Sequence, residues 1–243
     1  CLTQLVDENS IGSQLFNFRF DGEDELGGHN LGNLILYGLG KVQSSPMDSI
    51  KLVRRLLRAK TQVFPMSETP TDLMAFYPEG RCRLGELSVD DMPIMPNDLM
   101  LAPLVKSMTP CKEAIKNADL IILGPGSFLT SVIPPLLVRD ITKALDRRKG
   151  HCVFIDNIVA EKSPAAQLTL DEKLNWIEKN IGCLPIDSVI CQDKTICSDK
   201  VNIICQDLAD NKVAHHHDNE KLIHALEACV NRFTPATKIE IAS

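Results

Sequence analysis

The segment ADLIILGPGSFLTSVIPPLLV, residues 118–138, constrains the fold of this chain more than any other part of the sequence. Its run at 119–123 is apolar after the first residue, which is typical of a strand buried on both faces of a parallel sheet. A helical stretch at 131–146 and a second apolar strand at 152–155 follow. Strand, helix and strand in this order predict a right-handed βαβ unit. We therefore expect an α/β fold of the doubly wound class with a mostly parallel sheet.

The sequence before this unit is of two kinds. Apolar residues at helical spacing between 2 and 20, a stretch entering from Gly28, and the Ser45-Pro46 pair predict a helical N-terminal segment. From Thr61 to Val89, short β-prone runs are separated by Pro- and Gly-containing turns, which predicts a small antiparallel β insertion. The expected strands of this insertion are 61–66, 72–77 and 81–89.

After the βαβ unit the alternation of strands and helices continues. We expect a helix at 110–118 before the unit, and then a helix at 171–182, strands at 186–191 and 201–205, and a helix at 219–233. The sequence has no internal repeat, low-complexity tract or flexible linker, so residues 1–243 are expected to form a single domain.

Composition narrows the class of protein. With 243 residues and 44% hydrophobic content, the chain can bury a substantial core. The net charge of −6 without a Lys/Arg cluster argues against nucleic acid or an anionic membrane as partner. No apolar run approaches the roughly 20 residues of a membrane span, and the start does not resemble a signal peptide. The nine cysteines form no Cys-x-x-Cys pair and suit reduced thiols, so a cytoplasmic location is expected.

The GPGSFLTS turn, 124–131, is the first candidate binding site. It lies at the carboxyl end of a buried strand, where open α/β sheets bind ligands. Gly124 and Gly126 allow a close approach of the main chain, and Thr130 or Ser131 can cap the following helix, whose free N–H groups attract anions. A phosphate or a carboxylate is the expected guest. A tight strand-to-helix turn without a ligand is the alternative that local spacing leaves open.

The GGHNLGN turn, 27–33, is the second candidate. Asn30 and Asn33 lie one helical turn apart and face the same pocket if the helix begins near His29. The alternative is that the Asn side chains only cap a helix and that the glycines only pack closely. Both interpretations stay open.

Catalytic and metal-binding patterns are weak in this sequence. His215, His216 and His217 are consecutive, and neighbouring residues on one short segment rarely converge on one ion. Asp90 and Asp91 resemble a solvated loop pair, and no Ser/His/Asp or Cys/His arrangement is evident. We therefore predict no catalytic residue and no metal ligand.

Three motifs in order give the chain a resemblance to a known family. FNFRFDGEDELGGHNLGNLIL, PMSETPTDLMA and ADLIILGPGSFLTSVIPPLLVRDI together resemble the YvcK-like branch of the CofD family, the bacterial gluconeogenesis factors. The likeness runs along essentially the whole chain. Members of the family begin with a first strand and a Gly-rich nucleotide loop, whereas this sequence begins downstream of both. The expected unit is thus a single CofD-like domain that lacks these parts.

The resemblance implies a Rossmann-like doubly wound fold in the cytoplasm. It implies binding of a UDP-sugar such as UDP-N-acetylglucosamine, a role in cell shape on gluconeogenic carbon sources, and protein partners in cell-wall synthesis; a homo-oligomer stays open. The alternative is a 2-phospho-L-lactate transferase acting on a nucleotide-activated donor, and only that alternative calls for a divalent metal. The ligand-binding residues implied are Gly28, His29, Asn30, Gly32, Asn33, Gly124, Pro125, Gly126, Ser127, Thr130, Ser131 and Asn157.

Overall fold

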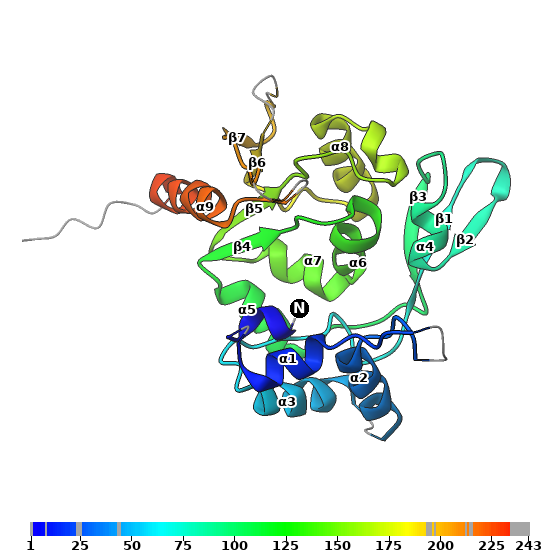
Figure 1. The fold of residues 1–243 in the computed structure, drawn as a ribbon. Helices are drawn as coiled ribbons and strands as arrows, with labels where there is room; N and C mark the ends of the chain where they lie inside the picture. The colour runs from blue at the N-terminus through cyan, green and yellow to red at the C-terminus, as the bar shows by residue number, and fades with distance from the viewer. Residues whose placement is uncertain are drawn as a thin grey trace, which may run out of the picture. The chain divides into compact units, whose positions relative to one another are not determined.

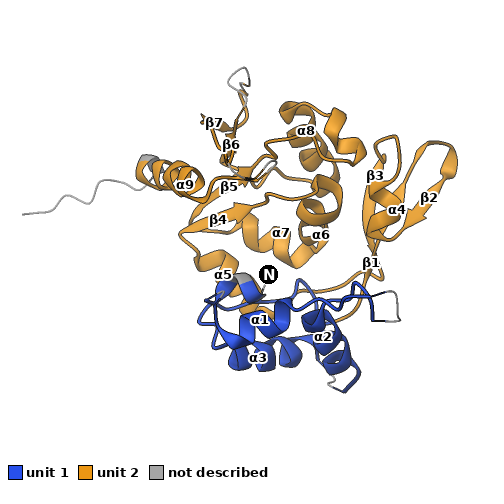
Figure 2. Cartoon of the chain, in the orientation of Figure 1, with its two compact units in different colours: residues 1–68 blue, residues 69–243 orange. Residues whose placement is uncertain are grey.

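The structure, a computed structural model, describes residues 2–7, 9–22, 26–42, 45–192, 196, 198–211, 213 and 216–233. The chain divides into two compact units, Cys1–Glu68 and Thr69–Ser243 (Figure 2). Each unit is described by itself.

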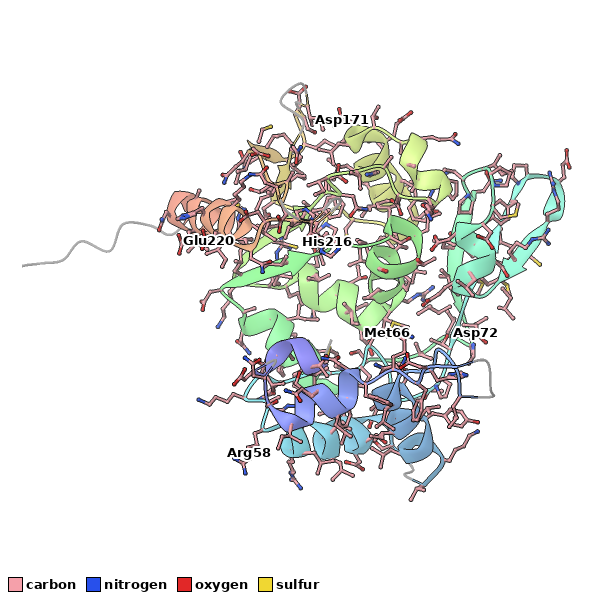
Figure 3. The ribbon with its side chains drawn as sticks, viewed as in Figure 1. Arg58, Met66, Asp72, Asp171, His216 and Glu220 are labelled. Atoms are coloured by element: carbon pink, nitrogen blue, oxygen red, sulfur yellow. The ribbon has the colours of Figure 1, made fainter. Side chains whose placement is uncertain are left out.

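The first unit is helical, as the sequence predicts. It contains a 3-10 turn η1 (Leu2–Leu5) and the helices α1 (Ile11–Asn17), α2 (Leu31–Val42) and α3 (Pro46–Leu57). Phe16, Val53 and Leu57 form its buried core. Arg58 ends α3 in the left-handed conformation, with φ 55° (Figure 3), and its N–H donates to the last carbonyls of that helix.

The second unit contains the parallel sheet. Its strands lie in the order β4 (Leu120–Leu123), β5 (His151–Ile155), β6 (Ser188–Cys191) and β7 (Asn202–Cys205), and all neighbours are parallel (Figure 1). The predicted α/β class with a mostly parallel sheet is confirmed. The carboxyl ends of these strands therefore share one edge of the sheet.

Helices cover both faces of this sheet. Every residue of β5 from Cys152 to Ile155 is buried, so side chains on both faces are shielded. On one face, Val153 and Ile155 pack in a cluster with Ala225 and Cys229 of α9 (Asn219–Phe233). In Figure 1, α7 (Arg139–Asp146) and α8 (Leu170–Ile181) lie on the side of the sheet opposite α9.

The remaining helices of this unit begin with ordinary signals. α8 opens with a capping box of Thr169 and Glu172, and α5 (Thr109–Asn117) has Pro110 in its first turn. Asp171 and Glu220 lie in the first turns of α8 and α9 (Figure 3), where the helix dipole favours a negative charge. Within the part of the chain that the structure describes, none of the helices combines the length and apolar character that crossing a bilayer requires.

The antiparallel insertion exists, but its strands differ from those predicted. Its order is β2 (Cys82–Leu84), β1 (Asp72–Phe76), β3 (Asp98–Ala102), with a 3-10 turn η2 (Pro78–Gly80) in the hairpin. Residues 61–66 form no strand, which corrects the prediction; Pro65 cannot donate to a ladder. The predicted strand 81–89 is wrong after Leu84. Gly85, at φ 90°, turns the chain there, and the short helix α4 (Glu86–Asp90) follows.

The predicted helix 131–146 is in fact three pieces. A π-helical turn η3 (Phe128–Val132) leads into α6 (Ile133–Leu137), and α7 follows. Pro134 and Pro135 lack the N–H groups that would continue the first piece, and Val138 is extended, with ψ 102°. The sequence places the helical segment correctly but misses its breaks.

Candidate functional site

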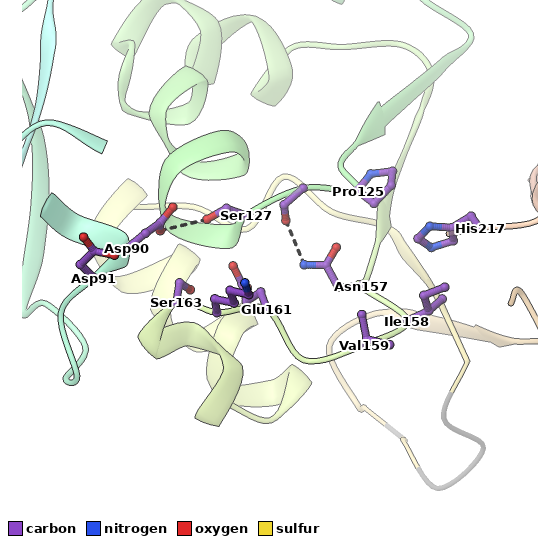
Figure 4. A pocket seen from close by; sticks show the side chains of 12 residues that line it. Asp90, Asp91, Pro125, Ser127, Asn157, Ile158, Val159, Glu161, Ser163 and His217 are labelled. Atoms are coloured by element: carbon purple, nitrogen blue, oxygen red, sulfur yellow. Dashed lines mark hydrogen bonds between the residues drawn. The ribbon is translucent and has the colours of Figure 1, made fainter. Parts of the chain in front are cut away.

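A cavity of about 430 Å³ lies at the carboxyl ends of β4 and β5 (Figure 4). This is the edge at which open α/β sheets bind ligands. The lining comes from four segments: the loop after β4, the loop after β5, the end of α4, and the segment before α9, which contributes His217. The lining residues are Pro125, Gly126, Ser127, Asn157, Ile158, Val159, Glu161, Lys162, Ser163, Asp90, Asp91 and His217.

The GPGS loop depends on its two glycines. Gly124 has φ +76°, and a Cβ there would lie 2.9 Å from the Ile155 carbonyl oxygen. A Cβ on Gly126 would lie 3.0 Å from Ser131 Cβ. The Asn157 Nδ2 donates to the Gly126 carbonyl oxygen at 3.0 Å, which fixes the loop to the end of β5. The structure thus brings Pro125, Gly126, Ser127 and Asn157 together in the cavity lining. Gly124 and Ser131 belong to the same loop but are not among the lining residues.

The helix cap in this loop is Ser127, which corrects the assignment to Thr130 or Ser131. Ser127 Oγ accepts from the Thr130 N–H at 3.4 Å, because the helix begins at Phe128, earlier than predicted. The Phe128 N–H donates to Glu161 Oε2 at 3.0 Å. Two of the amides expected to attract an anion are therefore already used. Within the described residues, the Gly126 and Ser127 N–H groups have no acceptor.

Asp90 is held by the same loop, which corrects its assignment as a solvated residue. Its two carboxylate oxygens accept from Ser127 Oγ at 3.2 Å and from Thr130 Oγ1 at 2.9 Å. Asp91, next in sequence, is exposed and lines the cavity. The contacts of Asp90 join residues 37 and 40 positions apart, a separation that local sequence patterns do not report.

Two polar atoms in the walls of the cavity lack partners. Glu161 Oε1 and His217 Nε2 are buried and make no hydrogen bond among the described residues. A buried acceptor without a donor costs about 1–3 kcal/mol, and such atoms call for an explanation. A bound ligand that donates to them would offset this cost. The sequence carried no signal for either residue, because both lie in irregular segments outside any motif.

The environment of His217 disfavours the charged form of its imidazole. Burial lowers the pKa of its imidazole, and a hydrogen bond to the Asp156 main chain opposes that effect. Since the Asp156 carbonyl can only accept, the bonded ring nitrogen carries the proton. Nε2 is then an acceptor.

The depressed pKa of His217 predicts a pH-dependent stability. In the unfolded chain this group takes up a proton below about pH 6.5, whereas in the folded chain it resists protonation. The unfolded state then binds more protons, so the free energy of unfolding should fall between about pH 7.5 and about pH 5.5. Denaturant unfolding at these two pH values measures the loss, and His217→Gln should reduce it. Burial also lowers the pKa of His151, so part of the loss should remain in that variant. An unchanged pH dependence in His217→Gln would refute the assignment.

The GGHNLGN turn lies in the other unit and is explained largely by local packing. Asn30 Oδ1 accepts from the Asn33 N–H at 3.0 Å and so caps α2. A Cβ on Gly32 would lie 2.6 Å from the Phe16 carbonyl oxygen. Gly28 has φ +75°, and its N–H donates to the Phe20 carbonyl oxygen. His29 is exposed, and its carbonyl oxygen accepts from the Phe20 N–H. Asn33 is exposed. A shared ligand for this turn and the GPGS loop stays a prediction.

The two described histidines of the triplet lie in different environments. His217 lines the cavity, His216 is exposed, and His215 lies outside the described residues. Across the described ranges, no group of three or more His, Cys, Asp or Glu side chains is arranged to hold a metal ion.

Comparison with known proteins adds a family to this geometry. The family model described as "2-phospho-L-lactate transferase CofD" matches residues 1–233. A relative from Yersinia pestis is 42% identical over 243 residues, which are 98% of this chain and 79% of the relative. A relative from Pasteurella multocida (strain Pm70) is 39% identical over 230 residues, covering 93% and 75%. A relative from Vibrio cholerae is 41% identical over 229 residues, covering 93% and 77%. Each is called "Putative gluconeogenesis factor".

A solved structure is also similar to the chain. The crystal structure of a UPF0052 family protein from Bacillus halodurans matches with a TM-score of 0.83 and 25% identity, over 93% of this chain and 80% of that one.

Proposed function

Because the chain belongs to the CofD family, we propose that it is a regulatory protein that binds a UDP-sugar in the cavity beside the GPGS loop. Two main-chain amides that find no acceptor among the described residues, those of Gly126 and Ser127, are the observation that carries this proposal. They lie at the carboxyl edge of a parallel sheet, where a phosphate is commonly bound. Lys162 adds a positive charge to the same lining. Ser127 Oγ donates to Asp90 Oδ1 at 3.2 Å, so a hydroxyl and a carboxylate do meet in the lining. Because Ser127 also caps the helix and Asp90 also binds Thr130, we assign this pair to holding the loop and favour binding over catalysis.

Isothermal titration calorimetry with UDP-N-acetylglucosamine tests the proposal. We expect binding by the wild type and an affinity lower by about tenfold or more in Asn157→Ala, because the Gly126 carbonyl loses its anchor. Asn180→Ala is the matched control, since Asn180 bonds only to Trp176 of its own helix. Absence of heat from the wild type at millimolar ligand would contradict the proposal.

The names of the relatives point to gluconeogenesis, and the resemblance of the sequence implies the finer role in the cell. We propose that the ligand-bound chain acts in the cytoplasm with protein partners of cell-wall synthesis, and that cells need it to keep their shape on gluconeogenic carbon sources. In a strain that lacks the chain, the wild type should restore cell shape on such a carbon source. Asn157→Ala should restore it poorly, and Asn180→Ala fully. If both variants restore cell shape equally, the cellular role does not depend on ligand binding in the cavity.

The alternative is a transferase of the 2-phospho-L-lactate type. The description of the matching family model favours it, as do the carboxylates of Asp90 and Asp91 beside the loop. The described residues offer no three-ligand cluster for a divalent metal, so we derive no metal-assisted step. Incubation with a nucleotide-linked phosphoacid and a deazaflavin acceptor distinguishes the two functions, because a transferase must release the nucleotide.

A further inference from the structure

The two ends of the cavity differ in chemistry (Figure 4). Asp90, Asp91 and Glu161 lie toward one end, where α4 meets the loop after β5. Pro125, Ile158 and His217 lie toward the other end. Asn157 lies between these two groups, and Ser127 lies beside Asp90, to which its hydroxyl donates. A ligand that spans the cavity therefore meets three environments in order.

The middle of the cavity suits an anion. The N–H groups of Gly126 and Ser127, which have no acceptor in the part of the chain that the structure describes, are donors, and Asn157 fixes the loop that presents them. A phosphate group placed here would lie near two carboxylates: Asp90, which is bonded to Ser127 and Thr130, and Glu161, which accepts from the Phe128 N–H. Lys162 in the same lining is the cation that offsets their repulsion.

The carboxylate end suits a neutral group rich in donors. An ionised carboxylate only accepts hydrogen bonds, and a second anion there would be repelled. Both oxygens of Asp90 accept hydrogen bonds, whereas Glu161 Oε1 is buried and has no partner among the residues described. Asp91 is exposed. Hydroxyl and amide N–H groups of a sugar ring are donors of the required kind.

The opposite end suits a planar ring. Pro125 and Ile158 offer apolar surface, and the imidazole of His217 offers an acceptor at Nε2 without a partner among the described residues. A heteroaromatic ring with a polar N–H edge matches this combination of flat apolar contact and one accepting atom.

We propose that the cavity fixes the direction of a nucleotide-sugar, with the base at the His217 end, the phosphates over Gly126 and Ser127, and the glycosyl group at the Glu161 end. Glu161 is then the residue that distinguishes a glycosylated nucleotide from the bare nucleotide. This inference rests on the proposed function and assigns specificity within the same site.

Glu161→Gln tests the direction with little change of shape. The amide oxygen of Gln can still accept from the Phe128 N–H, while its NH₂ group replaces the free acceptor by a donor. We expect the affinity for UDP-N-acetylglucosamine to fall by about tenfold or more, and that for UDP to change by no more than about twofold. Retained UDP binding shows that the variant is folded. Glu113→Gln, on the exposed surface of α5, is the matched control.

A second arm changes the ligand and compares the wild type with the variants. Replacing one sugar hydroxyl at a time by fluorine, which accepts but does not donate, should weaken binding at the position that meets Glu161. The same replacement should have no further effect in Glu161→Gln. His217→Leu should weaken UDP and UDP-N-acetylglucosamine alike.

The outcomes separate the two proposals. If the wild type binds neither UDP nor UDP-N-acetylglucosamine, the proposed function itself fails. If it binds them and Glu161→Gln weakens both equally, or neither, the proposed direction is wrong. If His217→Leu weakens only the sugar nucleotide, the direction is reversed.

Discussion

Gly150→Ala should lower the free energy of unfolding by about 3 kcal/mol or more, which for a chain of this length is a fall of about 10 °C in the midpoint of thermal unfolding. A Cβ at this position would lie 2.1 Å from the Ala118 carbonyl oxygen and 2.3 Å from that of Asp119. Both contacts are with main chain, so no flexible side chain can move aside. Either β5 or the start of β4 must shift.

The close approach of Gly150 to the main chain of Ala118 and Asp119 accompanies hydrogen bonds between the two segments. Lys149 and His151 donate main-chain hydrogen bonds to the carbonyls of Lys116 and Asp119, at 3.2 and 3.0 Å. These bonds set the register in which β5 enters the sheet beside β4. A side chain at position 150 would push apart the segments that Lys149 and His151 join, so the damage reaches the strands that position the cavity.

Differential scanning calorimetry of Gly150→Ala and Gly38→Ala checks this expectation. Gly38 lies in the exposed part of α2, and nothing stands within 4 Å of a Cβ placed there. Gly38→Ala should therefore stabilise its helix by about 0.5–1 kcal/mol. A midpoint for Gly150→Ala equal to that of the wild type would show that the two strands do not approach so closely.

Strongly patterned parts of the fold were predictable from sequence. The apolar runs at 119–123 and 152–155 predict buried strands, and β4 and β5 form at these places. β5 is buried from Cys152 to Ile155, but the predicted burial of β4 is wrong, because β4 stands at the end of the strand order among the described residues and Ile122 is 43% exposed. The antiparallel insertion was harder to predict, because β3 lies in a Pro-rich stretch. β3 takes its conformation from antiparallel pairing with β1, in which Asp72 faces Ala102 at one end and Phe76 faces Asp98 at the other. Such pairing is a tertiary effect that overrides local propensity.

The candidate site was predictable to a similar degree. Glycines after a buried strand indicate a ligand loop, and Pro125, Gly126, Ser127 and Asn157 do line one cavity. Asp90 was misjudged because its partners lie far along the chain. Glu161 and His217 carry no local pattern, and only the folded chain shows their unpartnered atoms.

Lys173→Met should destabilise the chain by about 3–5 kcal/mol, because it leaves a buried charge without its partner. Lys173 Nζ lies 2.7 Å from Asp156 Oδ1, and the two side chains are only 10% and 14% exposed. Asp156 directly precedes Asn157, and its main chain bonds to Ile190 and to His217. This ion pair therefore holds α8 to the end of β5 at the base of the cavity.

The double variant Lys173→Met/Asp156→Asn separates the cost of the lone charge from the value of the pair. Removing both charges should recover most of the lost stability, since a buried pair contributes little against neutral replacements of similar size. Lys179→Met, on the exposed surface of the same helix, should change the free energy of unfolding by no more than about 0.5 kcal/mol. Urea unfolding of the three variants gives the comparison. If the double variant is as unstable as Lys173→Met alone, packing of the Lys173 stem rather than the unpaired Asp156 carboxylate accounts for the loss.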